Sequence, residues 1–348
     1  MKKLALENNA ALVITDRLTR AYLSGADVAE GCMLFAAGAG YYFTDARYYS
    51  AAKIKAENAG FIPVLYTGEE SVKKVFSESG AAALYADFTR ITAADYLEYK
   101  TWCADLRDCS GLLSEMRAVK SEEELKLIAR ACEIAQNAYY AGMEKIKEGM
   151  TEKELADVIE KEMLSLGAEG PSFETIVAFG KNAAVPHHET GDTRLKEGCA
   201  VLVDMGAKYK GYCSDLTRTA FFGTPGEEFL SAYKAVLAAN LTAEESIRAG
   251  MTGREADKTA RDVLAAAGYG EYFTHSLGHG VGLEIHEYPA LSPKKEQELK
   301  EGQVFTVEPG VYIDGAFGIR IEDTVTLSGG KVKRLFTDGK ELKTIKRQ

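Results

Sequence analysis

Residues 146–154 read Ile-Lys-Glu-Gly-Met-Thr-Glu-Lys-Glu, and residues 247–255 read Ile-Arg-Ala-Gly-Met-Thr-Gly-Arg-Glu, the same frame 101 positions later. Each copy is typical of a helix that ends at glycine, followed by a Thr-x-x-Glu capping box that begins a second helix. Farther along, three residues repeat at an offset of 100: Gly170, Phe173 and Gly180 match Gly270, Phe273 and Gly280. This self-similarity indicates an internal duplication. Each half is expected to contain two helices followed by strands, with the sheets buried and the helices outside.

Upstream of the first copy, β-favouring runs alternate with helical stretches, which predicts an α/β domain. The runs are residues 11–15, 33–43, 60–66 and 82–85, and the helical stretches include residues 69–77 and 92–102. Ser121, with Glu124 three residues later, forms a capping box that opens a long amphipathic helix. We therefore expect an α/β domain at residues 1–120 and a duplicated α+β domain at residues 121–348.

Composition restricts the partners of this protein. Its 348 residues include 42 basic and 52 acidic side chains, for a net charge of -10. An acidic chain repels phosphate backbones and anionic lipid, so we expect no nucleic acid and no membrane as partner. No export signal is visible, and the six cysteines lack CxxC spacing. A cytoplasmic location with packing cysteines is the prediction.

The histidines gather in one part of the chain. All five lie between residues 187 and 286: His187, His188, His275, His279 and His286. Packing histidines should scatter, whereas imidazole is a common metal ligand and general acid or base. His279 also has glycine on both sides, which would let a metal or substrate approach the backbone closely. The clustering favours a site, although a loop histidine remains the alternative for His279.

Residues 201–206 and 212–219 predict a hairpin with two aspartates. If its turn centres on Tyr209 and Lys210, Asp204 and Asp215 lie directly opposite each other, with Cβ atoms about 5 Å apart. Two bare carboxylates so placed repel, so they need a proton or a cation. A different register would separate them, and two exposed strand aspartates remain the alternative.

A second hairpin is predicted around the turn signal Asp314-Gly315. Glu308 and Glu322 are equidistant from Gly315 and sit among apolar residues, where an ionised carboxylate needs compensation. The two acidic pairs and His279 make a mostly hard, oxygen-rich donor set. Such a set suits two divalent ions, with Mn²⁺ favoured and Co²⁺, Fe²⁺ or Zn²⁺ possible. Paired ions activate water and polarise a carbonyl, which favours hydrolysis.

In these residues the sequence resembles the M24 metallopeptidases, the pita-bread family of aminopeptidase P, prolidase and methionine aminopeptidase. The motifs VDMGA, CSDLTRT, SLGHGVGLEIHE, VEPG and RIED carry the resemblance. Residues 22–25 and 44–48 resemble the creatinase-type, RNase H-like N-terminal domain of Xaa-Pro peptidases, which methionine aminopeptidases usually lack. The resemblance implies that domain followed by an α+β pita-bread domain with a pseudo-twofold axis.

The resemblance also implies a role for each member of the acidic and imidazole set. Asp204 would chelate one ion, His279 and Glu308 would bind the other, and Asp215 and Glu322 would bridge both. Glu308 would also take a proton from the attacking water. No ligand is substituted, so the non-catalytic members of the fold are poor guides.

Substrate-side roles follow from the same resemblance. His187 and His286 match histidines that donate hydrogen bonds to the substrate carbonyl or the oxyanion. His275 matches a histidine that lines the proline side, and Arg320 an arginine that hydrogen-bonds ligand carboxylates or the substrate. His188 has a weaker claim and is expected at the surface or behind the site. Two features have simpler explanations: Tyr212 as a cross-strand aromatic rather than a pocket wall, and residues 340–347 as solvated charge.

The activity implied is hydrolysis of the bond between an N-terminal residue and proline, as in an Xaa-Pro aminopeptidase or Xaa-Pro dipeptidase. Short proline-containing peptides would be the substrates, and a homodimer is expected from the family. One alternative is a methionine aminopeptidase-like exopeptidase, which the N-terminal domain disfavours. Another is a non-catalytic peptide-binding homologue, which the complete ligand set disfavours.

Overall fold

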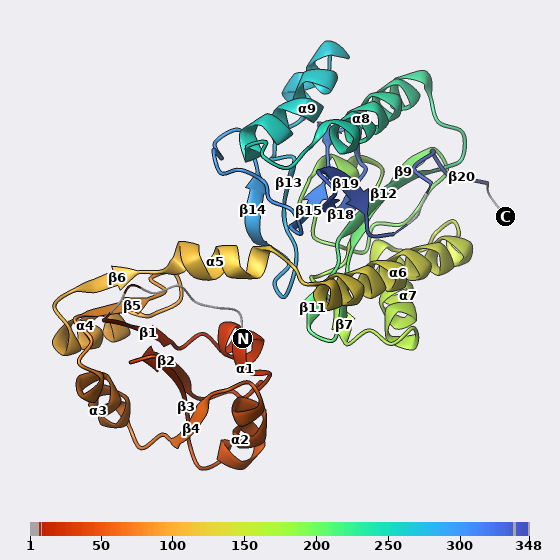
Figure 1. Ribbon diagram of the computed structural model, residues 1–348. Coiled ribbons are helices and arrows are strands. Elements are labelled where there is room, and N and C mark those ends of the chain that lie inside the picture. Colours follow the sequence, from red (N-terminus) through yellow and green to blue (C-terminus); the bar gives the residue numbers. More distant parts are fainter. Residues whose placement is uncertain (1–6, 8, 337–338, 347–348) are drawn as a thin grey trace. The chain divides into compact units, whose positions relative to one another are not determined.

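The chain folds into two compact units, residues 1–116 and 117–348 (Figure 1). The computed structural model describes residue 7, residues 9–336 and residues 339–346. Each unit has hydrophobic clusters of its own. Within the described residues, every helix is too short or too polar to cross a bilayer.

The first unit is the α/β domain that the sequence predicts. Its six-stranded sheet has the order β4-β3-β2-β1-β5-β6. β1, β2 and β3 form an antiparallel meander, and β4, β5 and β6 add in parallel. The strands are β1 (Ala10–Ile14), β2 (Cys32–Ala36), β3 (Ala39–Thr44), β4 (Ile62–Leu65), β5 (Ala83–Ala86) and β6 (Leu106–Asp108). The helices are α1 (Arg17–Ser24), α2 (Tyr49–Asn58), α3 (Glu69–Ser79), α4 (Ala93–Trp102) and α5 (Ser110–Ala118).

Strand alternation distributes the helices over both faces of this sheet, because successive side chains point in opposite directions. Val13 belongs to the same hydrophobic cluster as Val72 of α3 and Tyr99 of α4. Its neighbour Leu12 belongs to a separate cluster with Ala52 of α2. The sheet is therefore buried on both sides.

The single run predicted at residues 33–43 is in fact two strands, β2 and β3, joined by a tight turn. Ala37 and Gly38 have φ of 50° and 76°, the left-handed pair of values that a two-residue type I′ hairpin turn requires. The prediction was wrong because alanine rarely adopts this conformation, so the turn carries a weak sequence signal.

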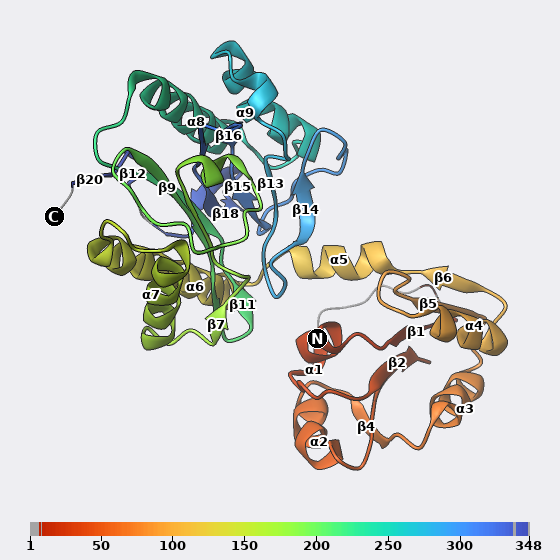
Figure 2. The same ribbon diagram turned by 180° about the vertical axis from the view of Figure 1, so that it is seen from behind.

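The second unit contains two helix pairs, as the repeat predicts. They are α6 (Glu122–Lys145) with α7 (Glu152–Ser165), and α8 (Glu227–Ser246) with α9 (Gly253–Ala266). All three predicted capping boxes are confirmed: Ser121 with Glu124, Thr151 with Glu154, and Thr252 with Glu255. α7 and α9 begin and end 101 positions apart. Both pairs lie outside the strands (Figures 1 and 2).

The repeated frame also makes the same long-range contacts in each half. Gly149 N donates a hydrogen bond to Leu195 O, and Gly250 N donates one to Leu299 O, each at 2.8–2.9 Å. In both halves, a backbone hydrogen bond therefore connects the turn before the second helix to a corresponding downstream segment. This conformity confirms the internal duplication.

Strands of the second unit form four small sheets, with the orders β11-β10-β7, β20-β12-β9-β8, β14-β13-β15-β18-β19 and β16-β17. In the first half the strands are β7 (Gly170–Pro171), β8 (Ile176–Phe179), β9 (Cys199–Met205), β10 (Ala207–Tyr209), β11 (Tyr212–Cys213) and β12 (Leu216–Phe222). In the second half they are β13 (Gly278–Gly280), β14 (Glu287–Leu291), β15 (Val304–Val307), β16 (Gly310–Ile313), β17 (Phe317–Arg320), β18 (Asp323–Ser328), β19 (Lys331–Arg334) and β20 (Thr344–Ile345). Two short 3₁₀ helices are η1 (Gly180–Ala184) and η2 (Gly270–Tyr272).

The C-terminal segment is not simply solvated charge. β20 pairs in parallel with β12, and Lys340 is only 4% exposed, in ion pairs with Glu244 and Asp323. Lys346 is exposed, as predicted, and Arg347 lies outside the described residues. The prediction was wrong for Lys340 because sequence alone does not show which distant strand a terminal segment joins.

Candidate metal centre

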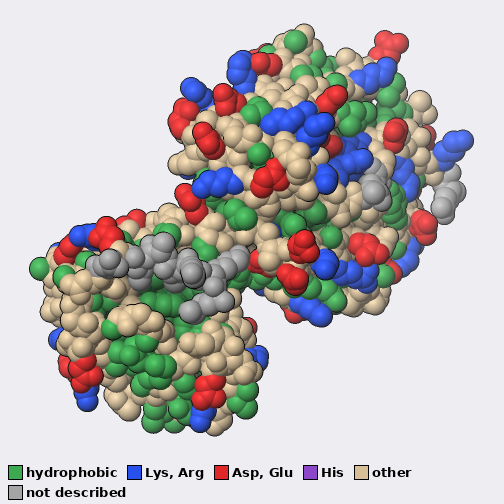
Figure 3. Space-filling view, viewed as in Figure 1, with side chains coloured by type: hydrophobic (Ala, Val, Ile, Leu, Met, Phe, Trp, Pro, Cys, Tyr) green, Lys and Arg blue, Asp and Glu red, His purple; other side chains and the backbone are tan. Residues whose placement is uncertain are grey.

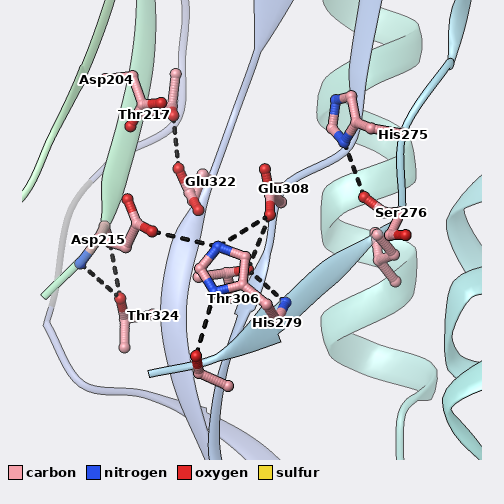
Figure 4. A network of polar contacts seen from close by, with 12 residues as sticks. Asp204, Asp215, Thr217, His275, Ser276, His279, Thr306, Glu308, Glu322 and Thr324 are labelled. Atoms are coloured by element: carbon pink, nitrogen blue, oxygen red, sulfur yellow. Dashed lines mark hydrogen bonds and ion pairs between the residues drawn. The ribbon is translucent and has the colours of Figure 1, made fainter. Parts of the chain in front are cut away.

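The five predicted ligands come from strand ends in both halves of the second unit. Asp204 lies in β9, and Asp215 directly precedes β12. His279 lies in β13, Glu308 directly follows β15, and Glu322 directly precedes β18. In Figure 4 the side chains of Asp215, His279, Glu308 and Glu322 point into a shared space, with Asp204 beside them.

Short distances show that four of these groups lie close together. His279 Nε2 lies 3.5 Å from both Asp215 Oδ2 and Glu308 Oε1. One ligand atom from each of Asp215, His279 and Glu322 lies within 4.8 Å of the others. Asp204 Oδ1 is buried, and the described residues offer it no hydrogen-bond partner. An orphaned carboxylate oxygen beside such a donor set fits a divalent cation.

The register of the first hairpin differs from the prediction. Asp204 lies opposite Thr217, and Tyr209 lies opposite Tyr212. The turn is at Lys210 and Gly211, whose φ values of 47° and 82° suit a type I′ turn, so the predicted direct pairing of the two aspartates was wrong. A shift of two residues keeps every side chain on its face. Asp215 is therefore a diagonal neighbour of Asp204.

The register of the second hairpin is as predicted. Val307 pairs with Asp323, and Gly310 pairs with Arg320. These two pairs bracket Glu308 and Glu322, which stand at opposite positions. The glutamates are thus brought together by the fold from residues 14 positions apart in sequence.

The carboxylates carry an unfavourable concentration of negative charge. Burial, followed by the charges of Glu322, Asp204 and Glu308, raises the pKa of Asp215 well above its usual range. Burial, followed by the charges of Glu308 and Asp204, also raises the pKa of Glu322 well above its usual range. Burial also raises the pKa of Glu308 to about 8. Protons or cations must offset this charge.

His279 is held in the state that a metal ligand needs. Burial lowers its pKa to about 4, so the ring is neutral near pH 7. Its Nδ1 lies 3.2 Å from Gly280 O and donates to it, which leaves the Nε2 lone pair facing the carboxylates.

The glycines that flank His279 serve packing rather than ligand access. A Cβ at Gly278 would lie 2.0 Å from Thr306 O, and one at Gly280 would lie 2.4 Å from Tyr288 O. Neighbouring backbone already occupies the space beside both glycines. The predicted approach of a metal or substrate to these positions was therefore wrong.

Three buried threonines that sequence reasoning missed orient the ligands (Figure 4). Thr217 Oγ1 donates to Glu322 Oε2 at 2.5 Å, and Thr306 Oγ1 donates to Glu308 Oε1 at 3.1 Å. Thr324 Oγ1 accepts from the backbone N of Asp215 at 3.2 Å and donates to its O at 2.7 Å. Their signal in the sequence is a hydroxyl two residues from a predicted ligand.

Arg320 is held by three side chains of the protein. Its Nη2 donates to Asp204 Oδ2 at 2.6 Å, its Nε to Thr217 Oγ1 at 3.0 Å, and its Nη1 to Tyr312 OH at 2.7 Å. The hydroxyl oxygen of Tyr312, a residue that sequence reasoning also missed, lies 2.9 Å from His275 Nε2. Of the two partners that the resemblance implies for Arg320, the structure pairs it with a ligand carboxylate.

A cavity of about 1120 Å³ opens over the ligands. His187, His275 and His286 line it, and the rings of His286 and His279 are 4.3 Å apart between centroids. His188 also reaches the cavity, but its Nε2 pairs at 2.9 Å with the fully buried carboxylate of Glu152. The structure thus brings all of the predicted substrate-side histidines to the ligand cluster.

Tyr212 stays away from the cavity lining. It is buried opposite Tyr209, and its hydroxyl donates to Glu124 at 2.9 Å. The interpretation as a cross-strand aromatic is confirmed.

A duplicated fold that gathers four carboxylates and one imidazole beneath an open cavity defines a metal-dependent hydrolase. Residues 126–328 match Metallopeptidase family M24, and residues 2–119 match the Creatinase/Prolidase N-terminal domain. The chain belongs to metallopeptidase family M24.

Relatives align over nearly the whole chain. An Xaa-Pro dipeptidase of Pyrococcus horikoshii is 39% identical, covering 92% of this chain and 91% of its own. The solved Xaa-Pro dipeptidase of Bacillus anthracis has a TM-score of 0.92 at 36% identity, covering 96% of this chain and 95% of its own. The X-Pro aminopeptidase of Thermotoga maritima has a TM-score of 0.88 at 34% identity, covering 97% of both chains.

Proposed function

We propose that this protein hydrolyses the peptide bond between an N-terminal residue and proline, with residues 121–348 as the catalytic domain. The observation that carries this proposal is the convergence of Asp204, Asp215, His279, Glu308 and Glu322, whose mutual repulsion calls for cations. Relatives named Xaa-Pro dipeptidase and X-Pro aminopeptidase support the choice of substrate.

Two divalent ions, Mn²⁺ in preference to Co²⁺, Fe²⁺ or Zn²⁺, fit this donor set. Asp204 would hold one ion, His279 with Glu308 would hold the other, and Asp215 and Glu322 would contribute to both. When bound, such ions lower the pKa of water and polarise a carbonyl. Arg320 keeps Asp204 oriented through its 2.6 Å hydrogen bond.

The chain's own groups move the protons and hold the substrate. Glu308 accepts the proton of the attacking water, a role open to its carboxylate because it lines the cavity and its Oε1 lies 3.5 Å from His279 Nε2. His187 and His286, both exposed to the cavity, donate hydrogen bonds to the scissile carbonyl and to the oxyanion that it becomes. His275 lies where it can line the pocket for the proline ring, which has no N–H to offer.

Charge around the cavity favours peptides that continue beyond proline. Among the described lining residues the cations are Lys153 and Arg320; Arg320 already pairs with Asp204, and Lys153 lies 3.3 Å from Asp192. The lining carries four further acids: Asp157, Glu160, Glu174 and Glu189. We infer that the free carboxylate of a dipeptide, which follows proline directly, meets this negative charge, whereas a longer peptide carries its carboxylate farther from the scissile bond.

The assembly and location are part of this proposal. Most exposed large apolar side chains of the described residues belong to the first unit, including Ile54, Leu97 and Leu112, which supports a homodimer formed through that unit. On the face shown in Figure 3, acidic and basic groups alternate in small clusters. All six cysteines lie in the described residues and are free, which supports a cytoplasmic location.

Metal analysis combined with three peptide substrates tests the function. With Mn²⁺ added, we expect turnover of an Xaa-Pro dipeptide and an Xaa-Pro-Xaa tripeptide and none of Met-Ala-Ser. Turnover of Met-Ala-Ser instead would favour a methionine aminopeptidase-like enzyme, and no turnover at all would favour a peptide-binding protein. Glu308→Ala should reduce kcat by ~10²- to 10⁴-fold; a near-wild-type rate would contradict its role.

A further inference from the structure

A buried polar cluster lies next to the backbone that carries the two glutamates, and its residues are not part of the cavity lining. At its centre is Asn240 of α8, which is fully buried. Its Nδ2 donates to Val307 O at 2.9 Å and to Ile321 O at 3.1 Å. These carbonyls belong to the residues directly before Glu308 and Glu322. One amide group therefore ties together the two backbone segments that carry the glutamate ligands.

Lys340 fixes the orientation of that amide. Its Nζ lies 2.5 Å from Asn240 Oδ1, so the Nδ2 group must face the two carbonyls. The same ammonium pairs with Glu244 Oε2 at 2.7 Å and with Asp323. Tyr233 OH donates to Lys340 O at 2.9 Å, and the segment continues into β20. The C-terminal segment therefore places the Lys340 ammonium within the cluster.

Asp323 extends the contact to the other side of Glu322. Its Oδ1 accepts from Arg218 Nη2 at 2.7 Å, while Arg218 Nη1 donates to Glu322 O at 2.6 Å. Glu322 is therefore held through the carbonyl before it by Asn240 and through its own carbonyl by Arg218. Lys340 contacts both Asn240 and Asp323, so a single ammonium supports both restraints.

From these contacts we propose that Lys340 is a positioning residue for metal binding: through Asn240 and Asp323 it sets the backbone of Glu308 and Glu322 so that their carboxylates bind divalent ions. The inference rests on the metal centre of the proposed function. If Lys340 only stabilised the fold, its contacts would not need to reach, through Asn240, the two carbonyl groups directly before Glu308 and Glu322. Partners behind metal ligands typically matter ~10- to 100-fold for affinity.

The test compares Lys340→Met with Lys346→Met, an exposed lysine of the same segment. Mn²⁺ dissociation constants are measured on metal-free protein by competition with a fluorescent chelator, and the unfolding midpoint is measured without metal. We expect Lys340→Met to weaken Mn²⁺ binding ~10- to 100-fold, Lys346→Met to match the wild type, and Lys340→Arg to restore part of the affinity. At saturating Mn²⁺, KM for the peptide should stay unchanged.

A second variant covers the case in which Lys340→Met does not fold. Asn240→Asp has nearly the same shape and retains a partner for Lys340, but cannot donate to Val307 O and Ile321 O; it should weaken Mn²⁺ binding in the same range. Equal affinity in wild type and whichever variants fold, with only a lower unfolding midpoint, would overturn the inference. Failure of the wild type itself to bind Mn²⁺ would instead reject the proposed function.

Discussion

Arg320 Nη2 lies 2.6 Å from Asp204 Oδ2, and this pair links the candidate metal centre to the part of the cavity that His275 lines. Through Tyr312 OH, the same guanidinium is linked to His275. The geometry therefore gives one buried cation two tasks: it orients a ligand carboxylate and positions a histidine that lines the pocket.

Arg320→Lys should lower kcat/KM for an Xaa-Pro-Xaa peptide by ~10²-fold, because a lysine cannot reach Asp204, Thr217 and Tyr312 together. Steady-state kinetics at saturating Mn²⁺ measure this, with the exposed Arg254→Lys as the matched control. An unchanged kcat/KM would show that charge alone suffices at this position.

The neighbours His187 and His188 should respond differently to alanine. His187→Ala should lower kcat by ~10²-fold with little change in stability, because His187 is exposed to the cavity. His188→Ala should reduce the free energy of unfolding by ~1–3 kcal/mol, because the buried Glu152 loses a partner. Steady-state kinetics and urea unfolding of both variants separate the two effects. A loss of stability in His187→Ala together with a loss of kcat in His188→Ala would contradict the assigned roles.

Stability of the metal-free protein should fall as pH rises from about 6.5 to about 8. Throughout that interval the unfolded Glu308 is ionised, whereas burial raises the folded pKa to about 8, so the folded state binds more protons. The interval begins at about 6.5 because buried His279, whose pKa is lowered to about 4, has the opposite effect on stability below that pH. Above about 8 this contribution is fully lost. Thermal unfolding from pH 5 to 9, with and without Mn²⁺, measures it. A metal-free midpoint that rises through this interval would contradict the assignment.

Amidation of the substrate tests the charge around the cavity. An Xaa-Pro amide should be cleaved with a kcat/KM ~2- to 5-fold higher than the free dipeptide, because the amide carries no negative charge to be repelled by the acids of the lining. The difference should shrink at high salt. A clear preference for the free acid would reveal a cation that binds the carboxylate.

Much of this architecture could be predicted from sequence, because it depends on local signals. The repeated Thr-x-x-Glu boxes predict α7 and α9, and Gly315 correctly centres the hairpin that aligns Glu308 with Glu322. The Lys210-Gly211 turn was harder to place, since lysine seldom adopts positive φ. Because the observed register differs from the predicted one by two residues, Asp204 and Asp215 still lie on the same face of the hairpin.

The remaining parts of the site depend on contacts between distant segments. Lys340 meets Asn240 across 100 residues, and Tyr312 meets His275 across 37. Neither residue has a motif of its own, so their contribution appears only when the two halves and the C-terminal segment have folded together.

Metal content of the folded chain tests the central claim most directly. After incubation with Mn²⁺ and removal of the excess, elemental analysis should find two ions per chain in the wild type and fewer in Asp215→Asn, since that carboxylate lies between the other ligands. A wild type that retains no metal, or an Asp215→Asn variant that retains the same two ions, would contradict the account.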